Sequence, residues 1–423
     1  MVGKYSGFVV AVAAMFGIFE VVNLLLEVDL SQHFTQGSEW MNRTGLRTER
    51  DVPECAVISV SSAPKAPTVT SSSTAHYYKQ YSEPSPFPNE FDGVWARAYN
   101  PWPQNTTIPC LPMEENFPQH DNSPTDTGLF FVKPYKTGSS SAAGINIRLA
   151  RGLARKLGKD YEFCKTRFDH SRVNQAFPSR DKKRSFAWSI IRDPTSRLVS
   201  QFFHFEVSRN KVEPSDDEFR RFLFSKSSDM IQDHYLSFLS DDVYRSESSN
   251  PADTANKILE DMDFIGITER MDESAVALSM LLNVSMSEVL FLKAKGHGGY
   301  DAGGGREGNK CTYIWPSFET TGMKEIFETD EFQALVRWDY VLYQAANRSL
   351  DMTIEKLGRE NFEKQLVQYR YARMMAQEKC LPDAVFPCSE GGRFVPPEQT
   401  TCVWKDSACS MDCLDQVGIE QNL

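Results

Sequence analysis

The sequence predicts an α/β fold in which helices cover both faces of a parallel sheet. From Leu129 onward, apolar runs alternate with amphipathic segments that have helical spacing. The runs LFFV, YEFC, FAWSII and DFIGI have the length and composition of short buried strands. With 423 residues, 41% of them hydrophobic, the chain can also bury a sizeable core.

The first segment of the chain is apolar enough to cross a membrane. The run from Gly7 to Leu26 has 20 residues, about 30 Å as a helix, which matches a bilayer core. Lys4 precedes it and Glu27 follows it, so the positive-inside rule places residues 1–6 in the cytosol. We therefore expect a transmembrane signal anchor at 7–26. A cleaved signal peptide is the alternative, because Glu20 is costly inside a spanning helix.

Positions 27–126 have the composition of a stem and linker. Stretches such as SVSSAPKAPTVTSSSTAH combine serine, threonine and proline with little apolar periodicity, which is typical of an extended stalk. The segment PWPQNTTIPCLPMEENFP is richer in aromatic residues and is expected to pack on the folded domain. We place that domain at 127–379 and a cysteine-rich tail at 380–423.

Two further features indicate the secretory pathway. Glycosylation sequons occur at Asn42, Asn105, Asn283 and Asn347. All nine cysteines follow the apolar segment, and we expect disulfide bonds in an oxidising lumen rather than a zinc site, since no pair has CxxC spacing. Because nine is odd, at least one thiol is free or pairs with another chain, and a homodimer is an alternative to a monomer. Five cysteines crowd the tail: Cys380, Cys388, Cys402, Cys409 and Cys413.

The charge is unevenly distributed. The formal net charge of −11 argues against general nucleic-acid binding. Between Leu129 and Lys211, however, 18 lysines and arginines stand against 6 aspartates and glutamates, a local net charge of +12. An acidic protein thus concentrates its positive charge around one region, which predicts an anionic ligand there.

The loop PYKTGSSS lies in this basic region, between the strand LFFV and a helix beginning near AAGINIRL. On that helix Ile145, Leu149 and Leu153 share one face. A hydroxyl-rich turn at a helix N-terminus offers backbone N–H groups to an anion, and Lys136 adds a cation. The motif is not a Walker A loop, because Lys136 precedes the glycine. An ordinary turn with serine caps is the alternative.

A second segment, FAWSIIRDPTSRLVSQFFHF, strengthens the prediction. Its strand ends at Arg192, Pro194 begins a helix, and Ser200 lies on that helix. Open α/β sheets bind ligands at the carboxyl ends of their strands. A guanidinium group at that position is suited to binding a phosphate through two hydrogen bonds.

The two segments together resemble a known family. KTGSSS and IRDPTSRLVSQF resemble the 5′-phosphosulfate loop and the 3′-phosphate motif of sulfotransferases that use 3′-phosphoadenosine 5′-phosphosulfate (PAPS). DFIGITERMDESAVAL and WDYVLYQAANRSLDMTIEKLG are similar to segments of the Golgi galactose 3-O-sulfotransferases. The resemblance covers roughly Leu129 to Gly358. It implies a three-layer α/β sandwich, PAPS as co-substrate and no metal.

The resemblance also assigns donor-binding residues. Arg192 and Ser200 match the pair that binds the 3′-phosphate. Sulfuryl transfer requires mainly positioning and neutralisation of the leaving phosphate, and Lys136 is the residue expected to stabilise it. The loop that would hold the 5′-phosphate consists of Lys136, Thr137, Gly138, Ser139, Ser140 and Ser141.

The general base is where this chain departs from the family. The glycan sulfotransferases place a histidine just before an Arg-Phe pair, whereas this chain has Lys165 near that position and His170 three residues after Arg167. We expect His170 to accept the proton of the acceptor hydroxyl. Lys165 is the rival, followed by His204 and Glu162.

We therefore predict a single-pass type II Golgi membrane protein with a lumenal PAPS-dependent carbohydrate sulfotransferase domain. Its partners would be a glycan acceptor and the bilayer, and nucleic acid is not expected. A glycine-rich segment, Lys293 to Cys311, is a candidate mobile lid in which Lys293, Lys295 and Arg306 could bind the donor, and a disordered surface insertion is the alternative. An inactive sulfotransferase-like glycan-binding protein and, less favoured, a nucleotide-dependent kinase are the alternatives.

Overall fold

The structure is a computed structural model that describes residues 88–103, 126–156, 158, 167–177, 180–225, 230–240, 250–293, 298–302 and 311–423. These residues belong to one compact unit, Lys79–Leu423. The expected anchor at 7–26, most of the stem and the strand YEFC lie outside the described residues. Within the described part, no helix is long and apolar enough to span a bilayer.

A four-stranded parallel sheet forms the centre of the unit, in the order β4-β3-β5-β6. The predicted runs LFFV, FAWSII and DFIGI all fall in it, which confirms the α/β fold with a parallel sheet. Leu129 pairs with Phe186, and Ile191 pairs with Ile267. The strands are β3 (Asp126–Val132), β4 (Arg167–Asp169), β5 (Arg180–Ile191) and β6 (Phe264–Ile267).

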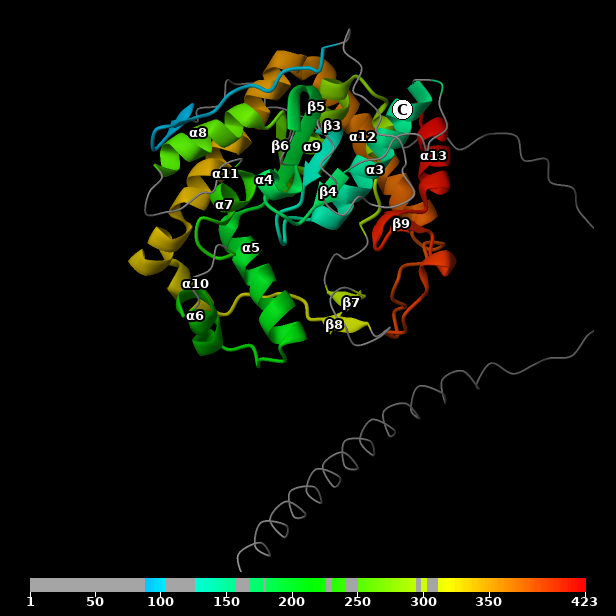
Figure 1. The fold of residues 1–423 in the computed structure, drawn as a ribbon. Helices are drawn as coiled ribbons and strands as arrows, with labels where there is room; N and C mark the ends of the chain where they lie inside the picture. Colours follow the sequence, from blue (N-terminus) through cyan, green and yellow to red (C-terminus); the bar gives the residue numbers. More distant parts are fainter. Residues whose placement is uncertain are drawn as a thin grey trace, which may run out of the picture. The chain divides into compact units, whose positions relative to one another are not determined.

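Helices lie on both sides of this sheet (Figure 1). Figure 1 shows α8 and α11 on one side and α3 and α12 on the other. The connection from β3 to β4 runs toward one edge of the sheet and that from β5 to β6 toward the other, so right-handed crossovers place their helices on opposite faces. The long helices are α3 (Ser139–Lys156), α8 (Pro251–Asp261), α9 (Met271–Leu282), α11 (Asp330–Leu357) and α12 (Arg359–Cys380).

Shorter elements complete the unit. The short helices are α4 (Val173–Ala176), α5 (Pro194–Gln201), α6 (Asp216–Phe224), α7 (His234–Leu239), α10 (Thr321–Phe327) and α13 (Met411–Glu420). A π-helix, η2 (Phe202–Arg209), continues α5, and 3₁₀ turns occur at η3 (Thr268–Arg270), η4 (Met286–Val289) and η5 (Pro397–Gln399). Three hairpins pair β1 (Glu90–Phe91) with β2 (Val94–Trp95), β7 (Gly299–Asp301) with β8 (Thr312–Ile314), and β9 (Cys402–Trp404) with β10 (Ser407–Cys409).

The core explains why these runs become strands. Phe130 and Phe131 are fully buried on opposite faces of β3. The Phe131 ring lies 4.4 Å from the Trp188 ring of β5, and the Trp188 indole donates a hydrogen bond to the Asn146 Oδ1 atom of α3 at 2.7 Å. On α3, Ile145 and Leu149 are buried as the predicted apolar face requires. The sheet and α3 therefore form one packed body.

Residues 88–103, which lie within the predicted stem and linker at 27–126, pack on this body. Tyr99 is 4% exposed, and its ring lies 5.4 Å from that of Phe264 in β6. The Trp102 ring lies 6.1 Å from that of Phe186. Trp102 belongs to the segment PWPQNTTIPCLPMEENFP, and this residue packs on the domain as predicted.

Disulfide bonds secure the tail, as the cysteine pattern predicts. Cys380 pairs with Cys413, Cys402 with Cys409, and Cys311 with Cys388. The buried Arg148 of α3 forms an ion pair of 2.8 Å with Asp415 of α13. Two disulfides thus cross-link the tail internally, and a third joins it to Cys311. The ion pair joins the tail to the helix that follows the KTGSSS loop.

Candidate active site

The carboxyl ends of all four strands meet at one edge of the sheet. The loop 133–138 follows β3, His170 follows β4, Arg192 follows β5, and Thr268 follows β6. The chain direction across the sheet reverses between β3 and β5, and ligands in open α/β sheets bind at such a switch point. The two sequence motifs thus lie on the two strands that flank the preferred ligand site.

The loop after β3 has the backbone geometry of an anion site. Lys136 and Gly138 both have left-handed backbone, with φ of 63° and 72°. Such turns point successive N–H groups into a concavity that binds anions. The buried Thr137 side chain donates a hydrogen bond to the carbonyl oxygen of Pro134 at 3.0 Å. The Lys136 conformation is uncommon for a residue with a Cβ atom, and strain of this kind concentrates at functional sites.

Helix α3 begins directly after this loop, at Ser139. Its first N–H groups have no partner inside the helix and carry the positive end of the helix dipole. Ser139 is buried, whereas Ser140 and Ser141 are half-exposed. The loop and the helix N-terminus, with their hydroxyl groups, can together surround a phosphate.

Arg192 is held against this loop. Its Nη1 atom donates to the carbonyl oxygen of Lys136 at 3.5 Å, and its Nε atom lies 3.8 Å from a carboxylate oxygen of Glu269. The backbone of Arg192 is clamped by the Tyr235 hydroxyl, which accepts from the Arg192 N–H at 3.0 Å and donates to its carbonyl oxygen at 2.6 Å. The arginine is therefore preorganised beside the loop.

A hydroxyl group links the two sides of the switch point. The Thr268 Oγ1 atom is 2.7 Å from the Thr137 carbonyl oxygen and 3.0 Å from that of Ile191. One side chain after β6 thus connects the loop after β3 to the end of β5. Sequence reasoning missed this threonine, because its role depends on two contacts far away along the chain.

A buried ion pair stabilises the position of Arg192 indirectly, through Tyr235. Arg197 of α5 and Asp339 of α11 are both fully buried, with 3.6 Å between their charged atoms. Burial raises the pKa of Asp339 to about 7, while the positive charge of Arg197 opposes the rise. The carboxylate also accepts from the backbone N–H groups of His234 and Tyr235 at 3.2 and 2.8 Å. This pair positions Tyr235, which in turn clamps Arg192.

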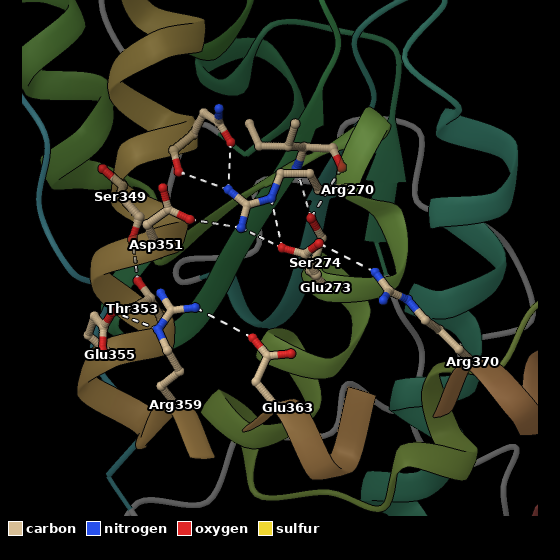
Figure 2. A network of polar contacts seen from close by, with 12 residues as sticks. Arg270, Glu273, Ser274, Ser349, Asp351, Thr353, Glu355, Arg359, Glu363 and Arg370 are labelled. Carbon is tan, nitrogen blue, oxygen red and sulfur yellow. Dashed lines mark hydrogen bonds and ion pairs between the residues drawn. The ribbon is translucent and has the colours of Figure 1, made fainter. Parts of the chain in front are cut away.

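A second arginine network anchors the end of β6 to α11 (Figure 2). Figure 2 shows Arg270 contacting Glu273 and Asp351. The ion pair between Arg270 and Asp351 is 2.8 Å long. Arg270 also donates to the Asn347 Oδ1 atom at 2.7 Å. The side chains of Arg270 and Asp351 are 20% and 19% exposed, so this network is less deeply buried than the Arg197–Asp339 pair.

The other predicted residue of the 3′-phosphate pair, Ser200, lies half-buried in the last turn of α5. His204 lies in the π-helix η2, half-buried, with its ring 4.6 Å from that of Phe205. π-Helical segments often occur at functional sites.

His170 lies at the carboxyl end of β4 with a defined ring orientation. Its Nδ1 atom is 2.7 Å from the carbonyl oxygen of Lys133. Because a carbonyl oxygen only accepts, Nδ1 carries the proton, and Nε2 holds the lone pair of the neutral ring. The ring stacks on Tyr135, with 4.7 Å between the ring centroids and 8° between the planes. An oriented imidazole with a free Nε2 lone pair is suited to general-base catalysis.

The surroundings keep His170 uncharged. Burial of its inner side lowers its pKa to about 4, and the positive charge of Lys133 contributes. The residue as a whole is still exposed, and water on its outer side moderates this desolvation. The imidazole is therefore neutral at neutral pH, because its pKa lies below the reference value of about 6.5.

Lys133 is a site residue that sequence reasoning did not select. It is 7% exposed, and its Nζ atom lies 5.2 Å from the centroid of the Phe168 ring. Burial lowers its pKa to about 8, with Asp406 opposing this and Lys405 adding to it. The available signal was its position, as the last residue before the PYKTGSSS loop.

The tail reaches this edge of the sheet. Ala408 of β10 packs on Gly144 of α3, where a Cβ atom would lie only 2.9 Å from the Ala408 nitrogen. Figure 1 shows β9 beside α3. A small cavity between α3, the hairpin β9–β10 and Leu290–Leu292 is lined by residues that include Ser140, Ser141 and Asp406. The hairpin β9–β10 thus borders the helix whose first residues belong to the candidate anion site.

Several predicted site residues belong to segments that the structure does not describe. Lys165, Glu162, Lys295 and Arg306 lie outside the described residues, as does most of the glycine-rich segment. Lys293 is exposed, and its backbone N–H donates to the Gln377 side chain at 3.0 Å. In the described ranges, no group of three or more His, Cys, Asp or Glu side chains is placed to hold a metal ion.

Comparison with known proteins gives one match. Residues 127–294 match a family described as the sulfotransferase family. This range contains the loop after β3, His170, Arg192 and Thr268, and it ends before the tail. No curated protein and no solved structure matches the chain. The match supports a sulfotransferase domain and an enzyme that transfers sulfuryl groups.

Proposed function

We propose that the protein transfers the sulfuryl group of PAPS to a carbohydrate hydroxyl in the Golgi lumen. One observation carries the proposal beyond the family match. The Arg192 guanidinium is 3.5 Å from the Lys136 carbonyl oxygen, at the switch point of the sheet. A donor with phosphate groups at both its 5′ and 3′ positions needs two anion sites, and this edge offers a helix N-terminus beside an arginine.

The donor side, which we define as residues 133–141 together with Arg192, would hold PAPS. The loop N–H groups and Ser139, Ser140 and Ser141 would bind the 5′-phosphate. Lys136 would neutralise the charge that develops on it as it leaves. Arg192, with Ser200, would bind the 3′-phosphate, which distinguishes PAPS from ATP.

The acceptor side, which we define as residues 168–170 at the carboxyl end of β4, would bind the glycan. The acceptor oxygen attacks sulfur and forms a new S–O bond. The bond from sulfur to the bridging oxygen of the donor breaks, and its electron pair stays on the departing phosphate. The hydroxyl proton passes to the His170 Nε2 atom, which is unprotonated because Nδ1 donates to Lys133.

A labelled-donor assay tests this function. Purified protein lacking the predicted anchor would be incubated with ³⁵S-labelled PAPS and disaccharides ending in galactose, N-acetylgalactosamine, glucose or a uronic acid. We expect label transfer to at least one sugar. Donor binding without transfer to any of them would support the inactive glycan-binding alternative, and phosphate transfer from ATP would support a kinase.

The Golgi location has its own test, since two described sequons differ in accessibility. Asn283 is an exposed residue that follows α9 as its C-cap, whereas the Asn347 amide, within α11, accepts a hydrogen bond from Arg270. We expect Asn283→Gln, but not Asn347→Gln, to remove one glycosidase-sensitive mass from protein made in mammalian cells. If none of the four sequons carries a glycan, the lumenal location loses its support.

A further inference from the structure

An exposed tryptophan lies at the edge of the acceptor side. Trp404, the last residue of β9, is 38% exposed. Its ring packs edge-to-face on Phe168 of β4, with centroids 6.1 Å apart and planes at 76°. Phe168 precedes His170 by two residues, so the tryptophan lies beside the strand end that carries the candidate base.

The turn after Trp404 reaches the same place. The Lys405 Nζ atom lies 5.8 Å from the centroid of the Trp404 ring. Burial is the main reason that the pKa values of Lys133 and His170 are lowered, and the positive charge of Lys405 adds to both effects. Asp406 acts on Lys133 in the opposite direction. Lys405 and Asp406 of the tail are therefore close enough to change the protonation of residues at the carboxyl end of the sheet.

The hairpin holds this tryptophan in place. The Cys402–Cys409 disulfide closes the hairpin, and Ala408 packs on Gly144 of the helix that follows the loop. The Ser410 N–H also donates to the Thr401 carbonyl oxygen at 2.9 Å. A side chain fixed in this way loses little conformational entropy when it binds a ligand.

The side chains of Trp404, Lys405 and Asp406 are chemically complementary to a sugar ring. A pyranose has a face of C–H groups and a rim of hydroxyl groups. An aromatic ring offers a surface for the face, and a lysine and an aspartate beside it offer hydrogen bonds for the rim. We infer that Trp404 stacks against the sugar ring that receives the sulfuryl group, while Lys405 and Asp406 bind its neighbouring hydroxyls.

This inference rests on the proposed function and adds a binding residue that the family match does not include. Trp404 lies beyond the matched range 127–294. The tail would therefore serve substrate binding as well as stability.

The test uses the disaccharide that wild-type protein sulfates fastest in the panel above. We expect Trp404→Ala to raise the acceptor KM about tenfold, while kcat and the dissociation constant of 3′-phosphoadenosine 5′-phosphate stay near wild type. Trp404→Phe keeps an aromatic face and should recover most of the loss. Val403→Ala removes an adjacent apolar side chain that is 58% exposed, on the other face of the same strand, and should change neither constant.

Three results would overturn the inference. One is an unchanged acceptor KM in Trp404→Ala, and another is an equal rise in Val403→Ala. The third is an equal loss of donor affinity, which would show a general disturbance of the hairpin and helix α3. Failure of the proposed function looks different, because the wild type would then transfer no label to any disaccharide.

Discussion

The donor side and the acceptor side are supported by different parts of the molecule. Arg192 is clamped by Tyr235, and behind Tyr235 stands the fully buried Arg197–Asp339 pair. His170, by contrast, is an exposed residue oriented by one carbonyl oxygen and one stacked ring, with a tail hairpin nearby. The difference suggests that a fixed part of the domain binds the common donor, whereas elements near the surface receive the acceptor.

The largest expected effect tests the acceptor side. His170→Ala should lower the sulfation rate by roughly 10²–10⁴ and leave donor affinity nearly intact, because the imidazole acts only on the acceptor proton. Rates measured with ³⁵S-labelled PAPS and donor titrations by calorimetry would separate the two. If Lys165→Ala abolishes transfer while His170→Ala is near normal, Lys165 is the base instead.

The same histidine predicts a pH dependence. A base must be unprotonated, and the pKa of His170 is lowered to about 4. The wild-type rate should therefore be level from neutral pH down to about pH 5 and fall as the pH drops through about 4. An acid limb near the reference value of about 6.5 would show that the ring is less desolvated than the structure indicates.

Removing Asp339 from the buried Arg197–Asp339 pair tests how much this pair stabilises the domain. Asp339→Ala leaves the Arg197 charge buried without its carboxylate and should lower the free energy of unfolding by about 3–5 kcal/mol. Asp351→Ala is the matched control in the second network, where Arg270 keeps Glu273 as a partner. Its loss should be about 1 kcal/mol. Denaturant unfolding would measure both, and equal losses would contradict the distinction between the two networks.

Arg192 and Lys136 should affect different steps, donor binding in one case and turnover in the other. Arg192→Ala removes the proposed 3′-phosphate ligand and should weaken binding of 3′-phosphoadenosine 5′-phosphate by about ten- to a hundredfold. Lys136→Ala should mainly lower kcat, because the positive charge of Lys136 stabilises the negative charge that develops on the leaving phosphate. Unchanged donor affinity in Arg192→Ala would remove the 3′-phosphate assignment.

The last prediction concerns the contact between the tail and helix α3. A glycine-to-alanine change inside a helix usually stabilises it, by about 0.5–1 kcal/mol. At Gly144 the added Cβ atom would lie 2.9 Å from the backbone nitrogen of Ala408, which cannot move aside as a flexible side chain could. Gly144→Ala should therefore destabilise the protein by about 1–3 kcal/mol. A rise in the melting temperature would show that the tail is not packed tightly there.

Much of the architecture follows from local sequence pattern. Apolar runs such as LFFV and FAWSII predict β3 and β5, and Pro194 marks the start of α5, because these signals act over a few residues. KTGSSS predicts an anion site for the same reason, since a turn and a helix N-terminus are local structures. The crowded tail cysteines predict disulfides but not their pairing.

The tertiary structure decided what these local elements do together. The closeness of Lys136 and Arg192 follows from the strand order, which the runs do not specify. The proton position and the lowered pKa of His170 follow from its packing against Lys133 and Tyr135. The place of Trp404 follows from a contact with Phe168, more than 200 positions earlier in the chain. Burial, electrostatics and long-range packing arise only when distant segments meet, so no pattern within either segment encodes them.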